Sequence, residues 1–189
     1  METVKNYPAP PFDRREILRY AGVRSALPEM ETLLDQCLSE VSPQLCYRVC
    51  FTRVPVTREG EVLSLGFLKT ASESLKKHLQ GCDKAVVFGA TVGVGLDRLI
   101  TKYSAVAPSK ALMLQAIGAE RIEALCDAFE KDVPDKATSR FSPGYGDLPL
   151  SLQKDIFLLL SCEKKIGLTL NGSMLMSPSK SVTAIIGIR

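Results

Sequence analysis

The chain has 189 residues, of which 46% are hydrophobic and 24% are charged. This composition is typical of a globular protein with a real core, and it excludes an intrinsically disordered chain. A net charge of +3 and an aromatic content of 6% without tryptophan argue against a nucleic-acid surface. No stretch approaches the roughly 20 apolar residues that span a membrane, so we expect neither a nucleic-acid nor a membrane partner.

Metal sites and export are also disfavoured. The six cysteines include no C-x-x-C pair, which argues against a zinc or thioredoxin motif. The single histidine, His78, is interpreted as a solvated residue on a helix surface. The N-terminal sequence has no basic segment followed by an apolar one, so no secretory signal is expected. We therefore predict reduced thiols, no metal site and a cytoplasmic protein.

The first third of the chain predicts two helices and a hairpin. Residues 1–12 contain three prolines and are expected to form an extended arm. Asp13 is predicted to cap a helix over 14–20, and Pro28 to begin a second helix that runs to residue 41. Strand formers alternate from residue 45, and a turn follows at 58–60, so residues 45–66 are predicted to form a β-hairpin.

The rest of the chain mixes helices with short strands. The predicted elements are a helix over 70–80 that begins with a capping box, a strand over 84–88, helices over 96–103, 108–131 and 151–160, and short strands over 168–170, 174–176 and 182–188. Asn171-Gly172 is a strong hairpin-turn dipeptide. Strands and helices are partly segregated along the chain, which favours an α+β fold over a doubly wound sheet.

Three glycines, Gly89, Gly93 and Gly95, follow the predicted strand at 84–88. Such a turn can present backbone N–H groups to a phosphate or a cofactor carboxylate. Glycines at these positions can equally allow a tight turn and close helix packing. The spacing is not that of the dinucleotide-binding motif, so both interpretations stay open.

Residues 140–149 form the most unusual stretch, because two prolines restrict the backbone and two glycines free it. Arg140 is suited to binding a carboxylate, and Tyr145 to stacking on a base. The alternative is a rigid surface connector. Asp127 and Glu130 lie late on the predicted long helix, where acids oppose the helix dipole; a solvated face is the default interpretation.

Three segments of the chain resemble a known family. Arg-Phe-Ser-Pro-Gly-Tyr-Gly-Asp-Leu-Pro at 140–149 resembles the R-x-x-P-G-Y-x-x-x-P signature of the activation domain of cobalamin-dependent methionine synthase. Residues 168–182 are similar to that domain's L-T-x-S-x-x-M-x-P-x-x-S-V segment, and Leu-Cys-Asp-Ala-Phe at 125–129 resembles its L-A-E-A-F helix. The resemblance covers about residues 85–188 well and the first 80 residues loosely.

The resemblance implies a function. In that family the domain binds S-adenosylmethionine and docks over the cobalamin-carrying domain when the cofactor has oxidised to cob(II)alamin. An electron from flavodoxin, or from another low-potential donor, makes cob(I)alamin, and adenosylmethionine then methylates it. Here the resemblance implies such a reductive methylation in trans, in methionine biosynthesis. The chain is not a complete methyltransferase, because it contains no D-x-H-x-x-G motif for cobalt, so a separate corrinoid protein would carry the cobalamin.

The resemblance also implies site residues, none of them catalytic, since cobalt is the nucleophile and the protein positions the methyl group. Arg140 would anchor adenosylmethionine through its methionyl carboxylate, and the backbones of Ser142 and Gly144 would contact the adenosyl part. Asp127, where the family has Glu, would meet the α-amino group. The residues expected to face the cobalamin are Tyr145, Met174, Met176 and Ser181.

The implied fold is an activation-domain-like α+β fold with a central twisted antiparallel sheet flanked by helices. Residues 1–82 would add N-terminal helices and a hairpin to the same domain, and 83–189 would form the core that holds the adenosylmethionine motif. Two alternative functions stay open. One is a non-catalytic adenosylmethionine- or corrinoid-binding module, and the other is an activator of a different corrinoid methyltransferase.

Overall fold

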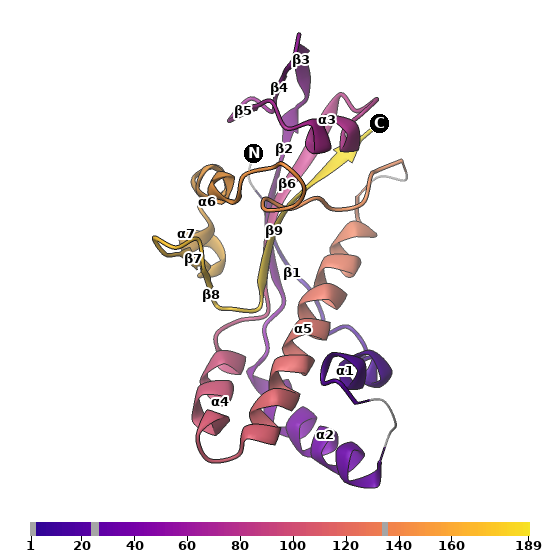
Figure 1. Ribbon diagram of the computed structural model, residues 1–189, viewed down its shortest axis with the longest axis vertical. Helices are drawn as coiled ribbons and strands as arrows, with labels where there is room; N and C mark the ends of the chain where they lie inside the picture. Colours follow the sequence, from indigo (N-terminus) through magenta and orange to yellow (C-terminus); the bar gives the residue numbers. More distant parts are fainter. Residues whose placement is uncertain (1–2, 24–26, 134–135) are drawn as a thin grey trace.

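A four-stranded sheet runs through the centre of the computed structural model, which describes residues 3–23, 27–133 and 136–189. The strand order is β1-β2-β6-β9, formed by Thr3–Asn6, Arg48–Pro55, Lys84–Thr91 and Ser181–Ile188. All neighbouring strands are antiparallel. In Figure 1, α5 lies along one side of this sheet, and α6 and α7 lie on the other. The structure confirms the predicted α+β class with helices flanking a central antiparallel sheet.

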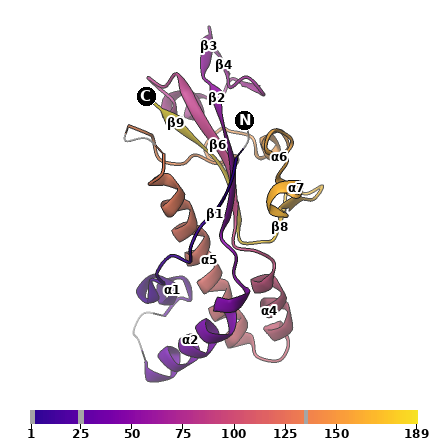
Figure 2. The same cartoon turned by 180° about the vertical axis from the view of Figure 1, so that it is seen from behind.

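Seven helices surround the sheet within the described ranges. They are α1 (Arg14–Tyr20), α2 (Pro28–Val41), α3 (Glu73–His78), α4 (Gly95–Ser104), α5 (Pro108–Glu130), α6 (Gln153–Leu160) and α7 (Cys162–Ile166), with 3-10 turns at Ser42–Gln44 and Leu150–Leu152. Figure 2 shows α1, α2 and α4 gathered around one end of α5. Among the described residues, no helix combines the length and the apolar character that crossing a bilayer requires.

Two small sheets accompany the central one. The first consists of β3 (Thr57–Glu59), β4 (Val62–Ser64) and β5 (Lys69–Thr70), and the second of β7 (Thr169–Leu170) and β8 (Met176–Ser177). The β7–β8 pair confirms a hairpin around Asn171-Gly172, but its second strand is Met176–Ser177, not residues 174–176 as predicted. Its loop has five residues, and the Asn171 side chain accepts hydrogen bonds from the N–H groups of Ser173 and Leu175.

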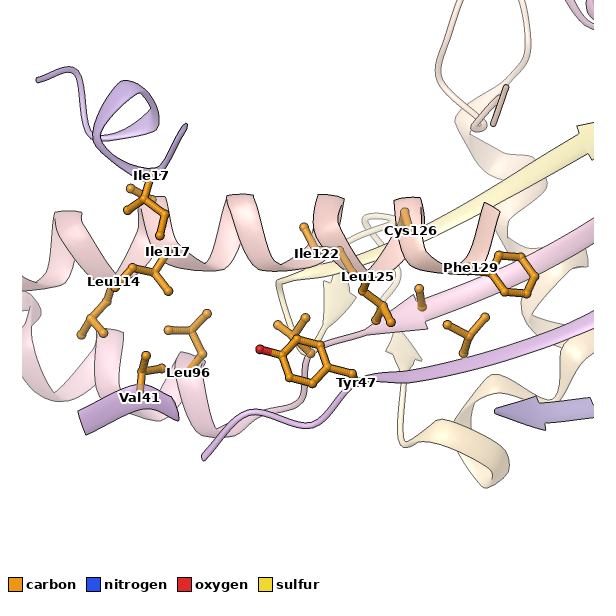
Figure 3. Packing of buried hydrophobic residues seen from close by; sticks show 14 of the residues in the cluster. Ile17, Val41, Tyr47, Leu96, Leu114, Ile117, Ile122, Leu125, Cys126 and Phe129 are labelled. Atoms are coloured by element: carbon orange, nitrogen blue, oxygen red, sulfur yellow. The ribbon is translucent and has the colours of Figure 1, made fainter. Parts of the chain in front are cut away.

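The first core lies between the sheet and α5, and Figure 3 shows its centre. Buried side chains of α5, among them Ile117 and Leu125, belong to the same cluster as Ile17 of α1 and Leu96 of α4. The long predicted helix forms because its apolar residues recur at helical spacing and face this core. Complete burial of each such side chain contributes about 1.5–3 kcal/mol, so this core is a major source of the stability of the fold.

The second core covers the opposite face of the sheet, under α3, α6 and α7. Cys50 of β2 and Cys162 of α7 face each other there, with their sulfur atoms 3.7 Å apart. Gly89 of β6 lies beneath them, and a methyl group on its Cα would come within 3.2 Å of the Cys162 sulfur. The missing side chain at Gly89 therefore lets α7 approach the sheet closely.

The predicted hairpin over residues 45–66 is wrong. β2 pairs along its whole length with β6, and β4 pairs with β3 instead. The physical reason is that β2 is covered on both faces: Val49 belongs to the first core, while Cys50 and Val54 belong to the second. A strand buried on both faces takes a central place in a sheet, which a local hairpin does not provide.

Two smaller predictions also need correction. Part of the expected extended arm, Thr3–Asn6, pairs with β2 as the edge strand β1. The N-cap of α3 is Ser72, whose hydroxyl accepts a hydrogen bond from Leu75 N, so the helix begins later than predicted, and with Leu at position 75 no capping box forms. At the glycine turn, a methyl group on Gly95 would lie 2.5 Å from the carbonyl oxygen of Gln44. This close approach supports the packing interpretation of that glycine.

A buried ion pair ties the N-terminal segment to α5. The side chain of Arg121 is fully buried and pairs with Glu120 beside it. The same guanidinium donates to the backbone oxygens of Pro10 and Pro11 at 2.6 and 2.7 Å. A buried charge is tolerated only with such complete pairing, so these contacts fix the path of the segment before α1.

We expect Arg121→Met to lower the free energy of unfolding by about 3–5 kcal/mol, because the substitution leaves the Glu120 carboxylate buried without its partner. Chemical denaturation at neutral pH measures this loss. Arg19→Met is the matched control, since the Arg19–Glu16 pair is largely exposed and is worth at most about 1 kcal/mol. Equal effects of the two substitutions would contradict the assignment.

Candidate functional site

Residues 138–141 extend the central sheet along the outer edge of β9. The N–H of Thr138 donates to the carbonyl of Gly187, and Phe141 exchanges two hydrogen bonds with Ile185, all at 2.9 Å. The register against β9 slips by one residue between the bridges Ala137–Ile188 and Phe141–Ile185, but the adjacent side chains of residues 140 and 141 still point to opposite faces. The Arg140 side chain accordingly reaches α5, while Phe141 packs against the second core.

The guanidinium of Arg140 binds three carboxylates of α5. Its nitrogens lie 2.5 Å from Glu123, 2.8 Å from Asp127 and 2.5 Å from Glu130. Burial lowers the pKa of Arg140 and the carboxylates raise it, with a net upward shift. Like charges at this helical spacing repel one another, so Arg140 relieves the repulsion and accounts for acids near the end of α5.

A hollow of about 320 Å³ lies beside this cluster. It is lined by Glu123, Arg140, Phe141, Ser142, Tyr145 and Val182. The Tyr145 side chain is 66% exposed, and its ring centroid lies 6.3 Å from that of Phe141. Three of the residues expected to bind adenosylmethionine or to face cobalamin, Arg140, Ser142 and Tyr145, are thus brought together.

A second, acidic hollow lies along α5. Glu123 also lines this second hollow, of about 830 Å³, together with Asp127 and residues of the N-terminal segment. Around Arg140, three carboxylates surround one guanidinium, so negative charge is in excess. An excess of fixed negative charge favours a cationic ligand over an anionic one. Asp127 therefore lies where a ligand amino group would be attracted.

The bend at residues 140–149 is hydrogen-bonded to the start of α3. Asp147 accepts hydrogen bonds from the Ser72 hydroxyl at 2.5 Å and from the N–H groups of Glu73 and Ser74 at 2.7 and 3.1 Å. These bonds hold the pKa of Asp147 well below its usual range. Gly144 adopts a φ of +94°, and its N–H donates to the Leu148 carbonyl at 2.8 Å. The bend thus has a fixed shape, with Tyr145 at its exposed side.

The residues expected to face the cobalamin do not all gather here. The hollow at Arg140 contains none of Met174, Met176 and Ser181. Met176 packs against the second core, and Met174 lies in the β7–β8 loop with a φ of +62°. The prediction that Ser181 faces the cobalamin needs correction. Ser181 is buried, and its hydroxyl lies 2.9 Å from the Thr91 hydroxyl and 2.7 Å from the Pro178 carbonyl. Its hydroxyl is therefore used inside the chain.

Sequence reasoning missed Glu123, Phe141 and Val182, which line the hollow. Only Glu123 left a usable signal, because residues 123, 127 and 130 recur at helical spacing and share a face.

A larger hollow of about 740 Å³ lies between α6, α7 and the β7–β8 hairpin. It contains none of the residues predicted to bind adenosylmethionine, so its size does not make it the better candidate.

The Asp147 contacts predict a specific pH dependence. A carboxylate with a depressed pKa stabilises the fold above its unfolded pKa of about 3.9, and loses this effect as the pH falls toward the folded pKa. We expect Asp147→Asn to unfold at a lower denaturant concentration at neutral pH, and the difference from wild type to shrink below about pH 4. Asp83→Asn, an exposed site, is the control. A difference independent of pH would contradict this.

No protein-family model and no curated protein sequence matches the chain. Among solved structures, the fold matches the crystal structure of the MetH reactivation domain bound to AdoHcy. The TM-score is 0.72, the match covers 99% of this chain and 78% of that one, and the sequence identity is 17%. The chain therefore has the fold of a methionine synthase reactivation domain, as the motifs at residues 140–149 and 168–182 implied.

Proposed function

We propose that this chain binds S-adenosylmethionine in the hollow at Arg140 and supports the reductive methylation of cob(II)alamin carried by a separate methionine synthase. The observation that supports this most directly is the hollow formed by Arg140, Ser142 and Tyr145 in a chain with the reactivation-domain fold. The neighbour's bound AdoHcy is the demethylated form of adenosylmethionine, which favours a ligand of the same class here.

The charge around the hollow suits this ligand. Adenosylmethionine has a positive sulfonium and a positive amino group, and the carboxylates of Glu123, Asp127 and Glu130 outnumber the single guanidinium of Arg140. We assign Asp127 and Glu123 to the amino group. Arg140 would bind the ligand carboxylate while it keeps contact with α5, because a guanidinium has five N–H donors.

Tyr145 completes the proposed site. Its exposed ring is available to pack on the adenine or on the corrin of the partner, as aromatic rings do with flat ligands. The backbones of Ser142 and Gly144 would contact the adenosyl part. The cobalamin would supply the nucleophile and the redox chemistry, and this chain would bind and orient the methyl donor. The electron would come from flavodoxin or another low-potential donor.

The decisive experiment mixes this protein with the host's methionine synthase in the cob(II)alamin state, adenosylmethionine and a low-potential reductant. We expect the absorption spectrum of methylcobalamin to develop only when this chain is present. Adenosylmethionine binding by calorimetry without any methylcobalamin would favour the non-catalytic module instead. Methylation of a different corrinoid protein alone would favour the other activator function.

Tyr145→Ala separates function from folding. Because the ring is largely exposed, the substitution should change stability by no more than about 0.5 kcal/mol. Loss of a stacked ring costs about 1–3 kcal/mol, so we expect at least about a fivefold slower methylation. Val106→Ala, an exposed apolar residue between α4 and α5, is the control with normal activity. A large loss of stability with a normal rate per folded molecule would give Tyr145 a structural role.

A further inference from the structure

The single histidine of the chain contacts the segment that holds Arg140. His78 was expected to be a solvated surface residue, and this is wrong. Its Nε2 lies 2.8 Å from the carbonyl oxygen of Ser139 and 2.9 Å from the hydroxyl of Thr138. Both partners directly precede Arg140, so the last residue of α3 touches the start of the candidate site.

The chemistry of these partners determines which nitrogen of the ring is protonated. A backbone carbonyl oxygen only accepts hydrogen bonds, so at 2.8 Å from Ser139 the Nε2 atom must be the donor. The Thr138 hydroxyl is already an acceptor for the N–H of Gly187 at 2.9 Å. His78 thus joins α3 to the same short segment that pairs with β9.

The His78 ring also supports the aromatic side of the hollow. It packs against Phe141 with a centroid distance of 4.9 Å, and Phe141 in turn lies 6.3 Å from the Tyr145 ring. Phe141 and Tyr145 line the hollow, whereas His78 does not. The imidazole therefore contacts Phe141, a residue that lines the hollow, but does not line the hollow itself.

The opposite end of α3 holds the other end of the same loop. Asp147 accepts hydrogen bonds from Ser72, Glu73 and Ser74, and His78 Nε2 donates to the Ser139 carbonyl and contacts the Thr138 hydroxyl. One six-residue helix thus fixes both ends of the segment from 138 to 147. Side chains that bind a ligand well are those whose positions are fixed beforehand by such supporting contacts.

We infer that His78 is a positioning residue for the hollow at Arg140: by holding the Ser139 carbonyl and the Phe141 ring, it sets the geometry in which Arg140 and Tyr145 receive a ligand. This inference rests on the proposed binding of adenosylmethionine, and it adds a residue outside the resembling motifs. It also gives α3, which precedes the well-matched part of the chain, a role in the site.

Two substitutions of His78 separate its two contacts. His78→Phe keeps an aromatic ring against Phe141 and removes the donor, whereas His78→Gln restores an N–H donor without the ring. Calorimetric titration with adenosylmethionine should show about fivefold weaker binding for His78→Phe, as expected for one lost hydrogen bond. His78→Gln should recover most of the affinity. Lys77→Ala, an exposed neighbour on α3, should bind like wild type.

Hydrogen exchange tests the inference independently of the ligand. The amide of Phe141 is bonded to Ile185, and we expect it to exchange faster in His78→Phe but not in His78→Gln. Unchanged affinity and exchange in His78→Phe would overturn the inference. Equal losses of affinity and of exchange protection in His78→Phe and His78→Gln, in proportion to a loss of global stability, would also overturn the inference. If wild type fails to bind adenosylmethionine, the proposed function fails, while the exchange result still decides whether His78 positions the segment.

Discussion

The candidate site depends on the pairing of residues 138–141 with the outer edge of β9. The backbones of Thr138 and Phe141 are hydrogen-bonded to that strand. Arg140 lies between these two positions, so its backbone is held on both sides. Because neighbouring side chains in an extended segment point to opposite faces, Arg140 is directed to α5 and Phe141 to the second core. One backbone pairing thus decides where the charge and the aromatic wall of the hollow lie.

Helix α5 uses two acid–arginine groups for different purposes. Arg121 and Glu120 are buried together; Arg121 donates to the backbone carbonyls of Pro10 and Pro11, and Glu120 accepts from the N–H of Asp13, so their charges are fully used inside the fold. Around Arg140, three carboxylates meet one guanidinium at the border of a hollow. A buried balanced pair holds the structure together, whereas an accessible unbalanced cluster leaves negative charge for a ligand.

Sequence reasoning succeeded where the signal is local. The Asp13 cap, the helix beginning at Pro28 and the long helix over α5 follow from capping chemistry and helical periodicity, and the structure confirms them. The hairpin over 45–66 failed because alternation shows that a strand exists without showing which strand lies beside it. The true neighbours of β2 are β1 and β6, both of which are distant in the sequence.

The sequence by itself determined six of the seven described helices, all but α7, together with the α+β class and the stiff bend at 140–149, because these depend on residues close together in the chain. Tertiary structure alone decided that Arg140 binds α5, that Ser181 is buried and that His78 meets Ser139. Those contacts join residues far apart in the sequence, and they form only when the edge of β9 brings them together. Local propensity contains no information about such distant partners.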